Sequence, residues 1–251
     1  MTGPLSGKTA FVTGGARGIG AAITRRLAAA GCDVAIVYYS SHGAAEAVSA
    51  DLRAAGRRAL ALQANVADPE SVARAAEQIH GAFGQVDVVV SNAASGVLRP
   101  PSELTVKHWR WCLETNALAL NLLATALAPR MPRGGRVIAL SSLGAERALP
   151  DYAFVGASKA ALEALVRSWA LELGGRGITV NAVRAGAVDT DALRAFPRGQ
   201  ALLDGFAERA PLGPALTADD VAGAVYLLCL PEAAMITGHT LVVDGGYSIA
   251  G

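Results

Sequence analysis

The stretch that decides the fold is Thr13-Gly14-Gly15-Ala16-Arg17-Gly18-Ile19-Gly20, a glycine-rich turn near the N-terminus. The apolar run Thr9–Thr13 leads into this turn and predicts a buried strand, and the residues after the turn have helical character. Glycines at such spacings let the backbone turn tightly and approach a pyrophosphate, which then lies at the positive end of the following helix. A glycine pattern alone also suits a simple tight turn. The strand before it and the helix after it favour a dinucleotide-binding turn.

The pattern of strand and helix continues along the whole chain. Six more short apolar runs follow the first: Val34–Tyr38, Ala59–Ala64, Val86–Val90, Val137–Leu140, Ile178–Val183 and Thr240–Val243. They lack alternating polarity, which is typical of strands buried on both faces. Stretches of helical length lie between them, for example Ala44–Ala55, Pro69–Phe83 and Ala157–Leu173. We therefore predict an α/β fold, a doubly wound, seven-stranded parallel sheet with helices on both faces (Rossmann type), as a single domain over residues 1–251.

Composition excludes several classes of protein. The 251 residues are 52% hydrophobic and 17% charged, which excludes a disordered chain, and the net charge of +1 gives no footprint for nucleic acid or anionic membranes. A surface so poor in charge suggests that partner subunits cover part of it. Three distant cysteines show no metal-binding spacing, and the four histidines form no cluster, so no metal site is predicted.

The sequence also gives no indication of a signal peptide or of a membrane span. The segment MTGPLSGKTAF has no apolar core of the kind that signal peptides carry. The apolar stretch Thr115–Pro129 is too short for a membrane span and contains two asparagines. We expect a cytoplasmic protein.

The end of the second predicted strand bears on the cofactor. NAD-binding folds of this kind place an Asp or Glu there for the ribose hydroxyls, whereas this chain reads Val37-Tyr38-Tyr39-Ser40-Ser41. Arg17, in the glycine turn, can face a 2′-phosphate with a charge-assisted hydrogen bond, although it also suits a solvated loop. The missing carboxylate and the available cation together predict NADPH as the cofactor.

The spacing TGxxxGIG resembles that of the short-chain dehydrogenase/reductase family. Asn65-Val66 looks like its adenine contact, and Ser91-Asn92-Ala93-Ala94 looks like its NNAG element with two replacements. Either asparagine also suits a turn held by side-chain to backbone bonds. The cofactor contacts that the resemblance implies are Gly14, Arg17, Gly18, Ile19, Gly20, Ser40, Ser41, Asn65, Val66, Asn92, Ala93, Lys159, Gly186, Val188 and Thr190.

A departure from the family's YxxxK pattern concerns the catalytic tyrosine. Lys159 is present, but Val155 stands four residues before it and has no hydroxyl; Tyr152 lies seven residues before the lysine instead. Seven residues are close to two helical turns, so we expect Tyr152 to share a helix face with Lys159. In conjugate reduction the hydride goes to the β-carbon of an enoyl thioester, so a hydroxyl on the enolate oxygen must lie farther from the nicotinamide. A shift of about one turn, roughly 5 Å, is of that order.

This Y-x6-K spacing narrows the resemblance to enoyl-acyl-carrier-protein reductases, and residues 92–100, 141–152 and 186–193 are similar to the NADPH-dependent type III enzymes. Many members have a proline before the glycine where this chain reads Arg184-Ala185-Gly186. The substrate contacts that the resemblance implies are Ala94, Leu98 and Tyr152.

Catalytic roles follow from the resemblance. Tyr152 would donate to the thioester oxygen, and Lys159 would hold the nicotinamide ribose and lower the effective pKa of the tyrosine. Ser142 occupies the place of the ketone reductases' catalytic serine, where a structural role is equally open. Asn116 matches the family's active-site asparagine, and a hydrogen bond within its helix is the alternative.

The segment from Thr190 to Leu212 has mixed helical and Gly/Pro character and is predicted to be a substrate lid, with an ordinary surface loop as the alternative. Its arginines, Arg194, Arg198 and Arg209, are candidates for steering an acidic acyl carrier protein, with solvated surface arginines as an equally open alternative. The tail, residues 238–247, resembles the family's last strand, which implies a homotetramer.

The sequence thus predicts an enzyme that reduces a trans-2-enoyl thioester, carried by acyl carrier protein or coenzyme A, with NADPH, in fatty-acid or polyketide metabolism. A 3-oxoacyl or ketone reductase of the same fold is the nearest alternative. A dinucleotide-binding regulator without turnover is the alternative from another class; the intact Lys159 and the relocated tyrosine count against it.

Overall fold

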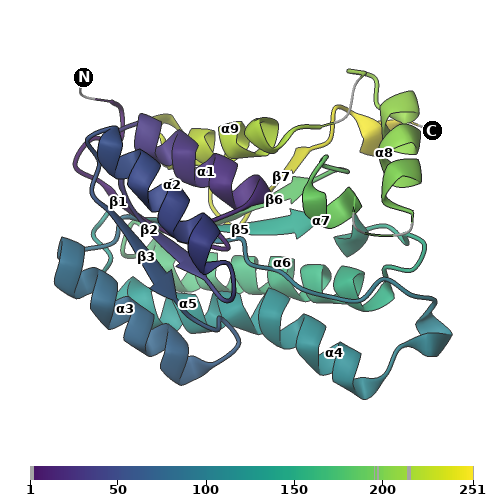
Figure 1. The fold of residues 1–251 in the computed structure, drawn as a ribbon, viewed down its shortest axis with the longest axis horizontal. Coiled ribbons are helices and arrows are strands. Elements are labelled where there is room, and N and C mark those ends of the chain that lie inside the picture. The colour runs from purple at the N-terminus through teal and green to yellow at the C-terminus, as the bar shows by residue number, and fades with distance from the viewer. Residues whose placement is uncertain (1–2, 195, 197, 214–215, 251) are drawn as a thin grey trace.

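A seven-stranded parallel sheet organises the computed structural model, which describes residues 3–194, 196, 198–213 and 216–250. The strands follow the order β3-β2-β1-β4-β5-β6-β7 (Figure 1). Their bounds are β1 Thr9–Thr13, β2 Asp33–Tyr38, β3 Ala59–Gln63, β4 Val88–Ser91, β5 Arg136–Ser142, β6 Thr179–Ala185 and β7 Thr240–Val243. The predicted fold class is confirmed, and every predicted strand end lies within two residues of the observed one.

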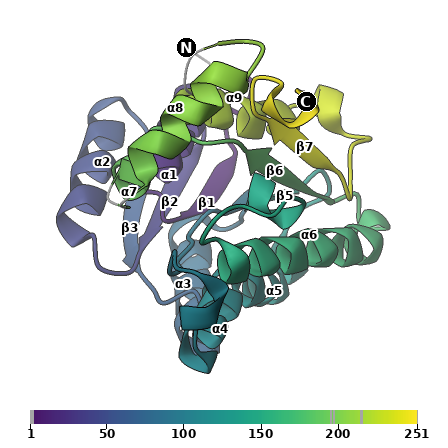
Figure 2. The same ribbon diagram turned by 90° about the vertical axis from the view of Figure 1, so that its right-hand side faces the viewer.

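Helices cover both faces of this sheet (Figure 1). Those on one face are α1 Gly18–Ala29, α2 His42–Ala54 and α9 Ala218–Cys229. Those on the other are α3 Pro69–Phe83, α4 Val106–Leu113, α5 Ala119–Leu127 and α6 Ala153–Gly174. α6 begins four residues before the predicted Ala157–Leu173. Two short helices, α7 Asp191–Arg194 and α8 Gly199–Arg209, lie beyond the carboxyl ends of β5 and β6, and Figure 2 shows them from that side.

The side chains of successive strand residues pack into two separate hydrophobic cores, one on each face of the sheet. Val12 and Ile36 pack beneath α1 and α9, whereas their neighbours Phe11 and Ala35 pack beneath α3 and α5. Each strand must therefore be apolar on both faces, which explains why the sequence shows continuous apolar runs instead of alternation. No helix within the described ranges combines the length and apolar character needed to cross a membrane.

The order of the strands reverses between β1 and β4, and hydrogen bonds of a side chain join the ends of these two strands. The buried Thr13 hydroxyl accepts hydrogen bonds from the Asn92 N–H (2.9 Å) and the Ala93 N–H (3.0 Å) and donates to the Val90 carbonyl (3.2 Å). The ladder between β1 and β4 ends at Val12 and Val90, so these bonds extend the junction beyond the paired residues. Ligands bind at such a switch point, beyond the carboxyl ends of the strands.

Replacing Thr13 with valine tests this junction. The substitution keeps the shape but leaves two N–H groups without an acceptor, which costs about 1–3 kcal/mol of stability when the groups are buried. We expect the urea concentration at the midpoint of unfolding to fall by the equivalent amount for Thr13→Val. Thr13→Ser keeps the hydroxyl and should lose only about 0.8 kcal/mol of stability, because it removes one methyl group. Equal losses in the two variants would contradict the assigned role of the hydroxyl.

Candidate active site

The glycine turn packs so closely against its neighbours that side chains would not fit at Gly14 or Gly20. Gly14 and Gly18 have positive φ angles of 64° and 51°, which favour glycine. A Cβ at Gly20 would collide with the Gly14 carbonyl and lie 2.6 Å from Asn92 Nδ2. Glycine at position 20 therefore lets the first turn of α1 pack directly against the glycine turn. The helix dipole favours an anion at this N-terminus.

Two other segments meet this turn. Asn92 Nδ2 donates to the Thr13 carbonyl at 2.9 Å and to the Gly14 carbonyl at 3.4 Å, so its side chain fixes the turn to the end of β4. A Cβ at Gly18 would lie 3.6 Å from Thr190 Cγ2, which brings the segment after β6 against the turn. The structure thus gathers Gly14, Gly18, Asn92 and Thr190 at one edge of the sheet.

The 2′ side of the site carries a cation and hydroxyl groups. Arg17 is exposed at the N-cap of α1 and forms no ion pair within the described part of the chain. Ser40 is exposed, and Ser41, the N-cap of α2, makes no side-chain capping bond. The two serines are available to a phosphate at the N-terminus of α2, and Arg17 to an anion at the N-terminus of α1.

Asn65, predicted to contact the adenine, closes a local turn with its side chain. Its Oδ1 accepts a hydrogen bond from the Ala67 N–H at 3.1 Å, and its own N–H donates to Ser71 Oγ at 3.0 Å. The turn alternative from the sequence is therefore observed for Asn65, as it is for Asn92. Val66 is buried directly after Asn65.

Lys159 lies deep at the carboxyl end of β5. Its side chain is buried, and Nζ donates to the Leu140 carbonyl at 2.7 Å. Burial lowers the pKa of Lys159 from 10.5 to about 8, and the negative charge of Glu163 acts in the opposite direction. An ammonium held this firmly on a strand end can donate to a ligand above the sheet edge.

Tyr152 precedes the helix that carries Lys159. It is the N-cap of α6, with φ −109° and ψ 11°, so the predicted shared helix face was wrong in its detail. The preceding residue, Asp151, has φ 62° in the left-handed region, and this turn sets the tyrosine outside the helix. A Cβ at Gly144 would collide with the Tyr152 ring, so the ring packs closely against that glycine.

The Tyr152 hydroxyl lies near the Ser142 side chain at the end of β5. Burial raises the pKa of Tyr152, and the neighbouring Ser142 hydroxyl partly opposes this rise. Ser142 Oγ accepts from the Gly144 N–H at 3.3 Å. The displaced tyrosine therefore reaches the serine at the strand end. A cavity of about 690 Å³ lies beside the ring, along residues 144–153 and the first turns of α6.

Val155, in place of the family's tyrosine, is buried in an apolar contact. A Cβ at Gly96 would collide with the Val155 side chain and lie 3.3 Å from Cys112 Sγ. This position offers no donor to a ligand.

Asn116 acts through neighbouring residues. It lies in a single π-helical turn, Glu114–Leu118, between α4 and α5. Its Oδ1 accepts from the Ser95 N–H at 2.8 Å, and its Nδ2 donates to the Ser95 carbonyl and to Ser158 Oγ, both at 2.9 Å. These bonds fix the segment after β4, where Ala94 and Leu98 lie, so the alternative of a bond within the helix is wrong.

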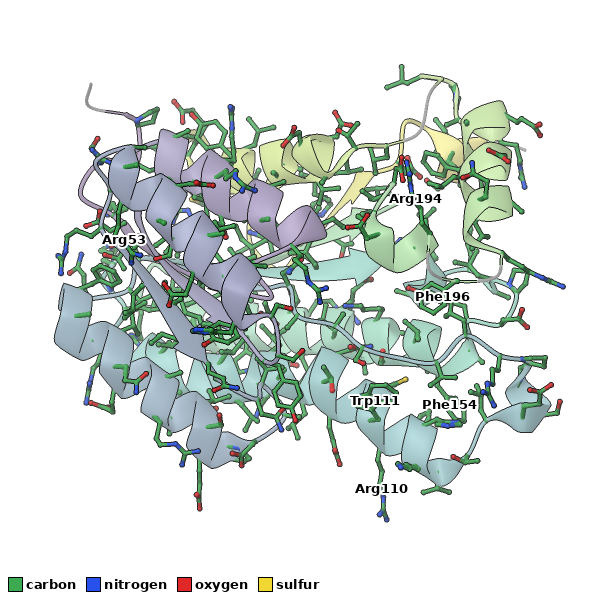
Figure 3. The ribbon with its side chains drawn as sticks, in the orientation of Figure 1. Arg53, Arg110, Trp111, Phe154, Arg194 and Phe196 are labelled. Atoms are coloured by element: carbon green, nitrogen blue, oxygen red, sulfur yellow. The ribbon has the colours of Figure 1, made fainter. Side chains whose placement is uncertain are left out.

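The predicted lid contains α7 and α8; its residues 195 and 197 lie outside the described residues. Arg194 forms a double ion pair with Asp189 at 2.5 and 2.6 Å, Arg198 lies 3.8 Å from Asp151, and Arg209 covers the Tyr247 ring. Arg194 is therefore not the free steering charge that the sequence suggested. Figure 3 shows Arg194 and Phe196 of this segment at the same end of the molecule as Trp111 and Phe154.

A buried charge network behind Lys159 was not predicted. Glu163 accepts from Ser141 Oγ (2.6 Å) and from Arg184 Nε (3.0 Å) and Nη2 (2.6 Å). Arg184 also pairs with Glu146. The available signal was the Lys159–Glu163 spacing of four residues together with an arginine inside an apolar strand.

Comparison with known proteins agrees with this geometry. The family model described as Enoyl-(Acyl carrier protein) reductase matches residues 14–248. The chain belongs to the short-chain dehydrogenase/reductase family. It is an oxidoreductase of that family, which confirms the resemblance inferred from the sequence.

Relatives within the short-chain dehydrogenase/reductase family differ in their reactions. The chain is 36% identical to 1-cyclohexenylcarbonyl-CoA reductase of Streptomyces collinus, over 96% of this chain and 87% of the relative. It is 39% identical to 3-oxoacyl-acyl-carrier-protein reductase of Escherichia coli, over 96% and 98% of the two chains. A short-chain dehydrogenase of Burkholderia cenocepacia, solved in complex with NADP, is 41% identical over 98% of this chain and 99% of its own, with a TM-score of 0.92. The cofactor of this chain is NADP(H), as predicted.

The pKa of Lys159 predicts a pH dependence. Above about pH 8 the ammonium loses its proton, whereas the raised pKa of Tyr152 keeps the phenol protonated there. We expect kcat/KM for NADPH to fall roughly tenfold per pH unit above this value. Lys159→Arg, which stays protonated, should lower the rate but remove this alkaline limb. A wild-type profile that stays flat to pH 9.5 would contradict the assignment.

The same shift affects stability with the opposite sign. Because the folded pKa of Lys159 lies below its unfolded value of 10.5, the unfolded chain binds more protons between about pH 8 and 10.5. The contribution of Lys159 to the free energy of unfolding should therefore increase with pH in that window. A loss of activity between about pH 8 and 10.5 without a fall in the free energy of unfolding would therefore come from Lys159 and not from unfolding.

Proposed function

We propose that this reductase uses NADPH to reduce the C2=C3 double bond of a trans-2-enoyl thioester. The observation that carries the proposal is the position of Tyr152, whose hydroxyl lies beside Ser142. The family's usual tyrosine position is occupied by the buried Val155, which offers no hydrogen-bond donor. NADPH supplies a hydride, which goes to C3 of the substrate. Electrons then move onto the thioester oxygen, and a proton taken from water and added at C2 completes the reduction.

The residues of the chain divide this work between them. Tyr152 donates a hydrogen bond to the developing enolate oxygen, an interaction that is stronger in the transition state than in the ground state. Lys159 holds the nicotinamide ribose, and its positive charge favours the tyrosine's donor role. Ser142 orients the tyrosine hydroxyl. Asn116 keeps the segment of Ala94 and Leu98 in place against the acyl group.

Reduction of a 3-oxoacyl thioester is the second candidate. Ser142 ends β5 at the place of the ketone reductases' serine, and the Escherichia coli relative is named as a 3-oxoacyl reductase. The proton donor of that reaction would also have to be Tyr152. A regulator without turnover is the third candidate, and steady consumption of NADPH with either thioester would exclude it.

The acyl thioester is proposed to sit on acyl carrier protein or coenzyme A, in fatty-acid or polyketide metabolism. The coenzyme A substrate in the name of the Streptomyces collinus relative supports a thioester. Of the lid arginines, Arg198, whose ion pair with Asp151 is long at 3.8 Å, and Arg209 are proposed to contact an acidic carrier. α7 and α8 are proposed to close over the substrate.

We also propose a homotetramer in the cytoplasm. The support for assembly is a set of exposed apolar side chains on α4 to α6 and on the α9 and β7 side, namely Trp109, Trp111, Leu118, Leu171, Leu227, Met235 and Val242. The support for the cytoplasm is that all three cysteines are free, buried thiols.

Arg17→Ala tests recognition of the 2′-phosphate. Loss of a charge-assisted contact should raise the KM for NADPH by about tenfold to a hundredfold, with little change for NADH. Arg25→Ala is a matched control on the same helix, because Arg25 faces Asp51 at 3.4 Å. If the unmodified enzyme used both cofactors equally, Arg17 would have no such role.

Tyr152→Phe tests the reaction. We expect kcat with crotonyl-CoA to fall about a hundredfold, with NADPH affinity nearly unchanged, because the lost bond acts chiefly in the transition state. The unmodified enzyme should leave acetoacetyl-CoA nearly untouched. Efficient reduction of acetoacetyl-CoA, with none of crotonyl-CoA, would make the enoyl assignment wrong.

Val155→Tyr, with Val155→Phe as its partner, completes this experiment. Both introduce an aromatic ring where Val155 packs beside Gly96 and Cys112, but only one restores a hydroxyl at the YxxxK position. Acetoacetyl-CoA reduction gained by the tyrosine variant alone would assign the change to the hydroxyl.

A further inference from the structure

Lys159 and Glu163 have the spacing of an ion pair without forming one. Residues four apart on a helix are neighbours on one face, and lysine and glutamate at this spacing attract each other. Lys159 Nζ instead donates to the Leu140 carbonyl. Among the residues that the structure describes, no ion pair joins the ammonium to the Glu163 carboxylate.

Arg184 and Ser141 bind this carboxylate, and both of its oxygens accept hydrogen bonds. Its Nε and Nη2 donate to the two oxygens of Glu163 at 3.0 and 2.6 Å, and Ser141 Oγ donates at 2.6 Å. Ser141 and Arg184 are paired residues of β5 and β6, so the register of the sheet delivers both donors to α6. The Glu163 side chain is 8% exposed and that of Arg184 12%, so water competes little with these bonds.

We propose that Arg184 is a positioning residue that keeps the Glu163 carboxylate away from the Lys159 ammonium, which leaves the ammonium free for the nicotinamide ribose and Tyr152. The proposal rests on the proposed role of Lys159, and not on which thioester is reduced. Without the guanidinium, a buried carboxylate would be left one helical turn from a buried ammonium. Pairing of the two is the most direct relief for both charges.

The same guanidinium reaches the segment that carries Tyr152. Arg184 Nη1 pairs with Glu146, which lies between Ser142 and Tyr152. One side chain thus joins α6, β6 and the loop of the displaced tyrosine. The Glu146 bond concerns the tyrosine loop, whereas the Glu163 bonds concern the lysine, so the two are separable by their effects on turnover and on cofactor binding.

The test measures NADPH dissociation constants by fluorescence titration, together with melting temperatures. We expect Arg184→Met to weaken NADPH binding about tenfold or more, because the freed carboxylate captures Lys159. Adding Glu163→Gln removes the competing charge and should restore binding to within about threefold of the wild type. Arg130→Met, which breaks the exposed pair with Glu77, is the control and should change neither quantity.

A double-mutant cycle with Lys159→Ala separates positioning from general support of the fold. When the ammonium is absent there is nothing for Glu163 to capture, so Arg184→Met should not weaken NADPH binding further in that background. A purely structural role would give the same additional loss in both backgrounds and would overturn the proposal. So would a failure of Glu163→Gln to rescue binding in a double variant that melts like the wild type.

If Arg184→Met does not fold, Arg184→Lys serves in its place. Lysine keeps the charge but cannot hold both carboxylate oxygens, so NADPH binding should weaken about threefold and recover with Glu163→Gln. No weakening, or no recovery, would overturn the proposal. These titrations contain no acyl substrate, so their outcome is independent of whether crotonyl-CoA or acetoacetyl-CoA is reduced.

Discussion

The reversal of strand order between β1 and β4 is the constraint on which the site depends. At this point the connections leave toward opposite faces, and the carboxyl edge of the sheet is open to a ligand. The Thr13 hydroxyl and the Asn92 side chain hold the two strand ends together. Thr13 begins the glycine turn, and Asn92 donates hydrogen bonds to it. The junction between β1 and β4 therefore also fixes the position of the glycine turn.

A second consequence of the parallel sheet is that the site is assembled from successive strand ends. Ser142 ends β5, Lys159 is anchored to the carbonyl of Leu140 in the same strand, and Arg184 lies near the end of β6. α6 crosses this edge and carries the lysine. Any group that must meet a substrate here has to be delivered by a loop or by the first turn of this helix.

Tyr152 is delivered by such a loop. A tyrosine in the first turn of α6 would project from the helix, at the place where Val155 packs beside Gly96. Tyr152 instead follows the left-handed Asp151, and its ring lies on Gly144. Two local backbone features, one strained residue and one glycine, thus move a hydroxyl without altering the helix or the lysine. This separation is how one fold can serve more than one reduction.

The charges around Lys159 are balanced by neighbouring residues of the chain. Lys159 is buried beside Glu163, and the fork of Arg184 takes the carboxylate that the helix would otherwise present to the lysine. Arg194, which the sequence offered as a steering charge, is likewise satisfied by Asp189. Counting charged residues along the chain therefore overstates what is available to a partner.

The sequence by itself determined the fold, the glycine turn, the likeness to NADP(H)-dependent reductases and the displacement of the tyrosine, because each depends on local spacing or on apolar runs of strand length. It did not determine that Tyr152 lies outside the helix, because Asp151 adopts its left-handed turn only where the loop after β5 meets α6. Nor did it determine the partner of Glu163. Lys159 is its nearest candidate along the chain, and only the register of β5 and β6 brings Arg184 to it first.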